Sequence, residues 1–180
     1  MRILGIDPGS RATGYGVVEV EGSRLVRLAG GVIRPGAQLL SERLACIAAT
    51  LESVIQKTEP QASALESVFT ARNPRSALLL GQARGAALVA CGIAGLPTEE
   101  YAPAQVKRAV VGYGAAGKEQ VQRMVQQLLG LASLPATDEA DALAVALCHA
   151  NWSRSPVPPR SAKPRAARRS ATPVRRVTPR

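Results

Sequence analysis

Three β-rich segments open this chain, and helical periodicity replaces them after residue 33. The segments are residues 2–7, 14–20 and 24–33. They are separated by Pro8-Gly9-Ser10 and Glu21-Gly22-Ser23, and short turns of this composition join antiparallel neighbours. From residue 39 to 57, apolar side chains recur at helical spacing, which predicts an amphipathic helix on the sheet. This change from strand-like to helical periodicity predicts a mixed α/β architecture.

Short apolar segments and helical segments then alternate. We expect a strand at 62–68, reached by a helical crossover and therefore parallel to its neighbour, and a fifth strand at 97–101. Helices are predicted at 74–90, 104–111, 118–129 and 138–151. The prediction is one domain, residues 1–152, with a mixed five-stranded sheet (an antiparallel meander plus parallel strands) flanked by helices.

The positive charge is concentrated at the C-terminal end. The net charge is +10, and residues 153–180 contain nine of the 23 basic residues, six prolines and no acid. Residues 1–152 are nearly neutral, with 14 basic against 13 acidic residues. Residues 153–180 therefore form a basic Pro/Arg-rich tail, predicted to be disordered. It either adds sequence-independent DNA affinity or is a solvated extension without consequence.

The cysteines suggest neither disulfides nor a thiolate metal site. Cys46, Cys91 and Cys148 are odd in number, far apart and set among apolar residues. This pattern is typical of small buried side chains in a reducing cytoplasm.

No secretion signal or membrane span is indicated. An acid and a proline, Asp7 and Pro8, interrupt the N-terminus before an apolar signal core develops. The apolar stretch 77–96 contains Gln82, Arg84 and four glycines, which favours a buried helix. We therefore expect a cytoplasmic protein without membrane contact.

Four acids occupy positions suited to metal-dependent chemistry: Asp7, Glu66, Asp138 and Asp141. The first two close apolar strands, and neighbouring parallel strands present such ends at one sheet edge. The last two share a face at a helix start, whereas Glu139 points roughly 100° away. Two Mg²⁺ ions about 4 Å apart would need several anionic oxygens. Singly, each acid also has an ordinary explanation as a turn residue or a partner of the helix dipole.

Five motifs in order along the chain resemble the RuvC family of Holliday-junction resolvases. They are Gly5-Ile6-Asp7-Pro8-Gly9, Glu66-Ser67-Val68-Phe69, Gly81-Gln82-Ala83-Arg84-Gly85, Gln105-Val106-Lys107 and Asp138-Glu139-Ala140-Asp141-Ala142-Leu143-Ala144. The resemblance implies an RNase H-like fold. It also implies a structure-selective endonuclease that nicks four-way junctions symmetrically in recombination and repair. The four acids would be catalytic and would hold two Mg²⁺ ions, for which Mn²⁺ substitutes, leaving 5′-phosphate and 3′-hydroxyl ends.

The resemblance also implies DNA contacts. Phe69, the only phenylalanine, would stack against junction bases, although the residues alone favour a core aromatic. Lys107 and Lys118 would meet the DNA backbone, the competing interpretation being solvated surface lysines. Arg72, Arg75 and Arg108 are weaker candidates for phosphate contacts. Two further residues, His149 and Trp152, are assigned no catalysis: the histidine would interact with the C-terminal helix dipole and the tryptophan would anchor the helix end.

A four-way junction is pseudo-two-fold symmetric, so two cuts require two sites, which a C2 homodimer supplies. Gly81 and Gly85 form a flat strip, either for self-contact or for tight packing on the sheet. The resemblance further implies handover from a RuvA–RuvB branch-migration complex. Two other functions remain open: an ATPase of the actin and sugar-kinase superfamily, and a junction-binding protein that has lost catalysis.

Overall fold

Five strands form one mixed sheet in the computed structural model, which describes residues 1–9, 11–67 and 74–154. The strands are β1 (Arg2–Asp7), β2 (Thr13–Glu21), β3 (Arg24–Ile33), β4 (Ala62–Glu66) and β5 (Thr98–Tyr101). Their spatial order is β3-β2-β1-β4-β5. The first three are antiparallel, and β4 and β5 run parallel to β1. The predicted meander and parallel strands are therefore confirmed.

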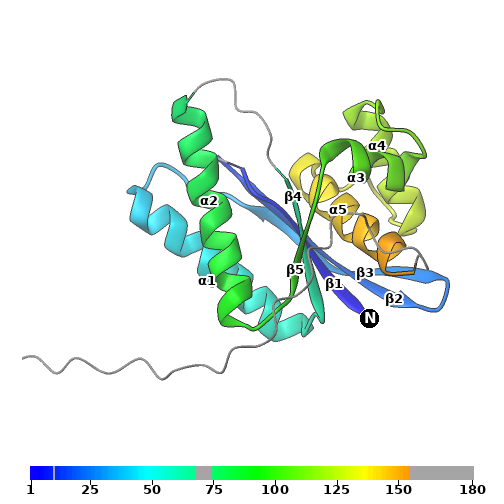
Figure 1. Cartoon of the computed structure of the whole chain (residues 1–180), viewed down its shortest axis with the longest axis horizontal. Helices are drawn as coiled ribbons and strands as arrows, with labels where there is room; N and C mark the ends of the chain where they lie inside the picture. Colours follow the sequence, from blue (N-terminus) through cyan, green and yellow to red (C-terminus); the bar gives the residue numbers. More distant parts are fainter. Residues whose placement is uncertain (10, 68–73, 155–180) are drawn as a thin grey trace, which may run out of the picture.

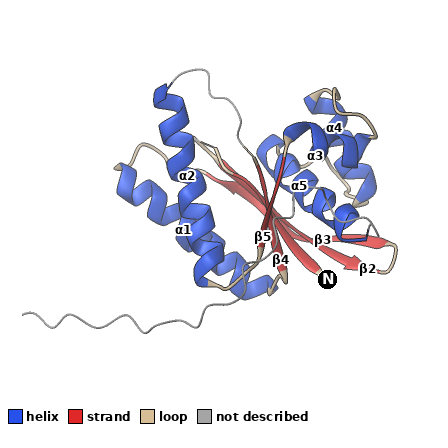
Figure 2. Ribbon diagram, in the orientation of Figure 1, coloured by secondary structure: helices blue, strands red, loops and turns tan. Residues whose placement is uncertain are grey.

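Helices cover both faces of this sheet. They are α1 (Leu40–Thr58), α2 (Pro74–Ile93), α3 (Pro103–Val111), α4 (Lys118–Leu128) and α5 (Thr137–Arg154). Figures 1 and 2 show α1 and α2 on one side of the sheet and α3, α4 and α5 on the other. Each face has its own apolar core.

Three predicted boundaries need correction. Helix α2 continues to Ile93, beyond its predicted end at residue 90. Strand β4 ends at Glu66 instead of residue 68, because its partner β5 ends at Tyr101, opposite Glu66. Helix α5 continues to Arg154, so residues 153 and 154 are helical and do not belong to the tail. Trp152 packs against the α5-side core at this end, as predicted. Residues 155–180 lie outside the described residues, so the predicted disorder of the tail stays a prediction.

Alternation along β1 decides which side chains face α5. Leu4 and Ile6 belong to the core beneath α1 and α2, whereas Ile3 belongs to the core beneath α5. A Cβ on Gly5 would lie 2.0 Å from the Ala142 carbonyl oxygen of α5. Because side chains alternate between the two faces of a strand, Asp7 lies on the same face as Ile3 and Gly5, the face that α5 covers.

Glycines let α5 approach the sheet backbone closely. A Cβ on Gly14 would lie 1.8 Å from the Asp138 carbonyl oxygen, and one on Gly16 would lie 2.5 Å from the Leu143 side chain. Gly5, Gly14 and Gly16 together form a strip without side chains across β1 and β2, which we call the glycine track. The helix that carries two of the candidate acids therefore rests directly on the strands.

Helix α2 is much less buried than the sequence suggested. It is, among the described residues, the one helix long and apolar enough to cross a membrane, yet only 22% of that apolar window is buried. Its small side chains, including Ala83 and Ala87, form the buried stripe, and α1 packs beside it. A Cβ on Gly81 or Gly85 would meet nothing within 4 Å. The alternative prediction, that this strip packs tightly on the sheet, is therefore wrong.

The cysteines are free and mostly buried. Cys91 and Cys148 are buried, as predicted, while Cys46 is half-buried. Burial raises the pKa of the Cys148 thiol to about 12. Such thiols are chemically quiet, which fits side chains that only fill the core.

Candidate active site

Two neighbouring strand ends bring Asp7 and Glu66 to one edge of the sheet. Asp7 is the last residue of β1 and Glu66 the last of β4, and the two strands pair in parallel with Ile6 opposite Leu65. Ala64 belongs to the core beneath α5, so alternation places Glu66 on that face as well. Both carboxylates are therefore directed toward α5.

Helix α5 adds Asp138 and Asp141 from its first turns. The backbone of Asp138 lies against Gly14, the residue that pairs with Asp7 across β1 and β2. Glu139 is directed elsewhere, as predicted: it is 8% exposed and ion-paired with Arg27 of β3. The sheet and the helix thus present the four predicted acids to one another.

The pKa values of Asp7 and Glu66 reflect their burial first and their acidic neighbours second. Burial raises the pKa of Asp7 to about 7, with further increases from the negative charges of Glu66, Asp141 and Asp138. Burial and the charge of Asp141 also raise the pKa of Glu66, opposed by Lys107 and Lys118. Burial and the acidic neighbours together therefore favour the protonated forms of Asp7 and Glu66 more than the lysines favour the charged forms.

A pocket of about 190 Å³ joins the acids to the lysines. Its polar lining comes from Glu66, Asp141, Lys107 and Lys118, and its apolar lining comes from α3, α4 and α5. The Lys118 ammonium lies 2.8 Å from Asp141 Oδ2. Burial lowers the pKa of Lys118, but the hydrogen bond to Asp141 and the surrounding acids outweigh burial and raise it. Lys118 is therefore ion-paired with Asp141, one of the candidate catalytic acids.

Of the other predicted DNA contacts, Arg75 and Arg108 are described by the structure and do not line this pocket. Phe69 and Arg72 lie outside the described residues. Arg75 is exposed in the first turn of α2, and Arg108 lines a different pocket together with Trp152.

His149 occupies a half-buried position on α5 and has a structural role there. Tyr101 and His149 Nδ1 share a hydrogen bond of 2.8 Å, and burial lowers the histidine pKa. Since α5 continues beyond it for more than a turn, the predicted interaction with the helix C-terminus is wrong.

Two arginines near the acids were missed by sequence reasoning. Arg34 Nη2 lies 3.9 Å from Asp138 Oδ2, and Arg84 Nη1 donates a 3.2 Å hydrogen bond to the Glu66 carbonyl oxygen. Arg84 also forms an ion pair with Glu100. The available signal for Arg34 was its position directly after β3, at the same end of the sheet as Asp7.

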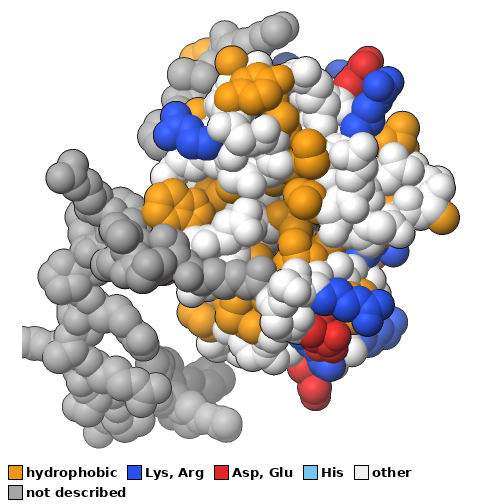
Figure 3. All heavy atoms as spheres, turned by 90° about the vertical axis from the view of Figure 1, so that its right-hand side faces the viewer, with side chains coloured by type: hydrophobic (Ala, Val, Ile, Leu, Met, Phe, Trp, Pro, Cys, Tyr) orange, Lys and Arg blue, Asp and Glu red, His pale blue; other side chains and the backbone are white. Residues whose placement is uncertain are grey.

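The surface seen from the α3–α5 side carries its charges in separate groups. In Figure 3, hydrophobic side chains run down the middle of this face, and Lys and Arg side chains lie in separate groups toward its edges.

The donor set suits a hard divalent cation such as Mg²⁺, which prefers carboxylate oxygens. Within the described residues, however, no three His, Cys, Asp or Glu side chains are close enough to surround one ion. The ion pair of Asp141 with Lys118 gives a physical reason for this spacing, as does repulsion among the acids. The residues fit the metal by chemistry, and a bound cation would require the carboxylates to approach one another more closely.

The chain matches a known family over most of its length. The model of the crossover junction endodeoxyribonuclease RuvC family matches residues 3–149. The chain belongs to this family. It is 55% identical to RuvC of Marinobacter nauticus over 153 residues, covering 85% of this chain and 87% of the relative. Identity to the Geobacter sulfurreducens protein is 56% over 152 residues, covering 84% and 93%.

Solved RuvC structures have the same fold. Thermus thermophilus RuvC in complex with a Holliday junction substrate matches with a TM-score of 0.81 and 41% identity, over 86% of this chain and 95% of that one. The yeast mitochondrial Holliday junction resolvase Ydc2 matches with a TM-score of 0.61 at 13% identity, over 83% and 78%, and supports the fold alone. The expected RNase H-like fold and RuvC resemblance are confirmed.

Proposed function

We propose that this RuvC-family chain resolves four-way DNA junctions by paired symmetric nicks, in recombination and repair. The observation that carries the proposal is the meeting of Asp7 and Glu66 with the acids of α5 beside Lys107 and Lys118. Family membership supports the reaction class, and the T. thermophilus relative solved with a Holliday junction supports the substrate. A match along residues 3–149 disfavours the ATPase alternative.

Asp7, Glu66, Asp138 and Asp141 would hold two Mg²⁺ ions per site, with Mn²⁺ as a substitute. When bound, the ions would promote deprotonation of a water and stabilise negative charge on the leaving oxygen. The water oxygen bonds to phosphorus as the bond from phosphorus to the 3′ oxygen breaks. The 3′ oxygen takes up a proton, so the products carry 5′-phosphate and 3′-hydroxyl ends.

The lysines of the pocket would hold the scissile strand. Lys107 lines the pocket beside Glu66, and Lys118 bonds to Asp141 at 2.8 Å. A phosphate entering the pocket competes with Asp141 for the Lys118 ammonium. Release of that ion pair would free a carboxylate oxygen as the DNA arrives. Substrate binding and completion of the acidic site are thereby coupled.

A homodimer would supply the two sites that paired nicking needs. Leu78, Gly81, Gly85 and Val89 are spaced as one stripe of α2, and Leu78 and Val89 are 69% and 57% exposed. The open space above both glycines allows a second helix to approach closely. We assign this stripe to the two-fold contact. The intact junction would be received from a RuvA–RuvB branch-migration complex in the cytoplasm and then nicked.

The test is a synthetic four-way junction incubated with Mg²⁺, with a linear duplex of the same sequence as the DNA control. The wild type should nick the junction in pairs, while Asp7→Asn and Glu66→Gln should bind it without cleavage. Glu19→Gln, at the opposite end of the sheet, is the matched acid control and should cut normally. A wild type that binds but does not cut in Mg²⁺ or Mn²⁺ would make this a silent junction-binding protein. ATP turnover without cleavage would restore the ATPase alternative.

A further inference from the structure

Glu139 is a buried acid between two candidate catalytic acids, and it faces away from them. Its side chain is 10% exposed, and its Oε1 accepts a 2.8 Å hydrogen bond from Arg27 Nε and lies 2.6 Å from Arg27 Nη2. A carboxylate buried to this extent is costly unless it is paired. The Arg27–Glu139 pair is therefore a fixed contact between the first turn of α5 and strand β3.

A β-bulge brings Arg27 to the correct face of the sheet. Val17 pairs with Ala29, but Val18 pairs with Arg27, which leaves Leu28 as the extra residue. Val18 belongs to the core beneath α5, so Arg27 opposite it faces α5 as well. Without the bulge, Arg27 would pair with Glu19 and face the other side. Bulges commonly redirect a side chain in this way near active sites.

Gly30 keeps a space open for the pair. A Cβ at this position would lie 2.5 Å from Glu139 Oε1 and 3.0 Å from Arg27 Nε. The Gly30 carbonyl oxygen in turn accepts a 3.0 Å hydrogen bond from Arg27 Nη2. Strand β3 thus supplies the Arg27 guanidinium, the Gly30 carbonyl oxygen that accepts its hydrogen bond, and the space above Gly30 that the ion pair occupies.

We propose that the Arg27–Glu139 pair positions Asp138 and Asp141 for catalysis by fixing the rotation of α5 about its axis. This inference rests on the proposed nuclease function. Side chains extend about 5–6 Å from a helix axis, so a rotation of about 10° moves a carboxylate by about 1 Å. A displacement of that size can reduce a catalytic rate by about 100-fold.

The other ion pairs of this turn are less suited to that task. Asp138 is paired with Arg34, which is 64% exposed, and Asp141 with Lys118, which is 57% exposed. Arg27 is 33% exposed and its partner 10%. Exposed pairs are weak and change partners easily, whereas a pair shielded from water holds its geometry. Arg27 and Glu139 are therefore assigned as positioning residues, which act on Asp138 and Asp141 through helix α5.

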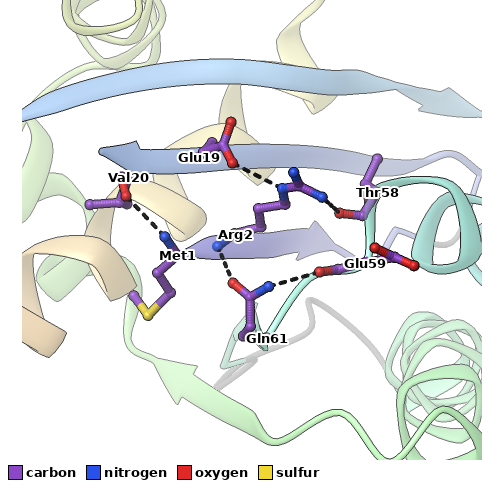
Figure 4. A network of polar contacts seen from close by, with 7 residues as sticks. All are labelled: Met1, Arg2, Glu19, Val20, Thr58, Glu59 and Gln61. Carbon is purple, nitrogen blue, oxygen red and sulfur yellow. Dashed lines mark hydrogen bonds and ion pairs between the residues drawn. The ribbon is translucent and has the colours of Figure 1, made fainter. Parts of the chain in front are cut away.

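The chain offers a matched control at the far end of the sheet. Figure 4 shows Arg2 bonded to Glu19 and to the Thr58 carbonyl oxygen, near the start of β1. The Arg2 Nε to Glu19 Oε1 distance is 3.0 Å, and the side chains are 36% and 21% exposed. This pair is similar in exposure but joins the neighbouring strands β1 and β2, at the end of β1 opposite Asp7.

The test compares Glu139→Gln, Arg27→Ala and their double variant with Glu19→Gln in the full chain. Single-turnover nicking, junction affinity in EDTA, Mn²⁺ binding by calorimetry without DNA, and Tm are measured. Either single variant should slow nicking and weaken Mn²⁺ binding about 10–100-fold at unchanged junction affinity. The double variant should be no slower than the worse single one. Arg27→Lys should restore part of the rate.

The outcomes separate a positioning role from a structural one. If Glu139→Gln lowers Tm as much as Glu19→Gln does but leaves nicking and Mn²⁺ binding intact, the inference is overturned. Should the Arg27 or Glu139 variants fail to fold, Gly30→Ala tests the same contact, and normal nicking by that variant counts equally against it. A wild type that never nicks overturns the proposed function first, whereas normal nicking by both wild type and Glu139→Gln overturns only this inference.

Discussion

Replacing Asp7 with asparagine should stabilise the metal-free protein at neutral pH while abolishing nicking. Burial and three neighbouring acids raise the pKa of Asp7 from 3.8 to about 7. The folded protein therefore holds this proton more tightly than the unfolded chain. The resulting stability is fully present below about pH 4 and is lost as the pH rises through about 7. Asparagine has nearly the same shape and cannot ionise, so it avoids this loss.

The magnitude follows from the displacement of the pKa. A rise from 3.8 to about 7, at about 1.4 kcal/mol per pH unit, corresponds to roughly 4 kcal/mol of unfolding free energy above pH 7. This is an upper limit, because partial exposure and small side-chain movements relieve part of the cost. We expect Asp7→Asn to be about 1–4 kcal/mol more stable than wild type at pH 8. Each kcal/mol corresponds to a rise in Tm of about 2–4 °C.

The assay is urea unfolding of both proteins in EDTA at a series of pH values from 4 to 8. The stability advantage of Asp7→Asn should grow across this range and level off above pH 7. Excess Mg²⁺ should then stabilise the wild type more than the variant, because a ligand bound only by the folded state adds to stability. A variant that is less stable than wild type at pH 8, or an advantage independent of pH, would refute the reasoning.

Four further predictions follow from the surrounding structure. Lys118→Ala should move the pH profile of nicking to higher pH, because its charge lowers the pKa of both strand-end acids. Gly14→Ala should lower the unfolding free energy by about 1–3 kcal/mol and slow nicking, whereas the unobstructed Gly92→Ala should preserve or raise stability in denaturant titrations. Gly81→Leu should weaken dimerisation in sedimentation velocity, and an unchanged dimer would count against the α2 interface. Truncation after Arg154 should flatten the salt dependence of junction affinity by about 0.9 in log–log slope per lost phosphate contact, and an unchanged slope would mean that the tail makes none.

Strand periodicity and turn composition were sufficient to predict the sheet and its two strand-end acids. The alternation that buries Leu4 and Ile6 on one face also sets Asp7 on the other, and local sequence contains that information. The exposed stripe of α2 was not predictable in the same way, because alanine and glycine reveal little about which side is buried. Small apolar side chains fit either environment, so composition suggested a buried helix where one stripe is open.

Contacts that depend on register were beyond sequence reasoning. Nothing local marks Leu28 as a bulge residue, yet the bulge decides whether Arg27 faces Glu139 or the opposite side of the sheet. The contact of Lys118 with Asp141 likewise joins helices α4 and α5 and requires their packing to be known. Both cases involve charged residues whose partners are remote in the chain. Residue type predicts that such a side chain needs a partner, but only the fold selects which one.

The same glycines and acids place stability and catalysis in opposition. Gly5, Gly14 and Gly16 let α5 contact the strands, which buries apolar surface but also brings its acids toward Asp7 and Glu66. Close approach therefore stabilises the core and raises the cost of ionising the site. Larger residues on the track would relieve the repulsion by lifting the helix, and would separate the acids that we propose as ligands of a divalent cation. Retaining both the track and the acids is consistent with a fold whose catalytic end gains its full stability only when a cation neutralises it.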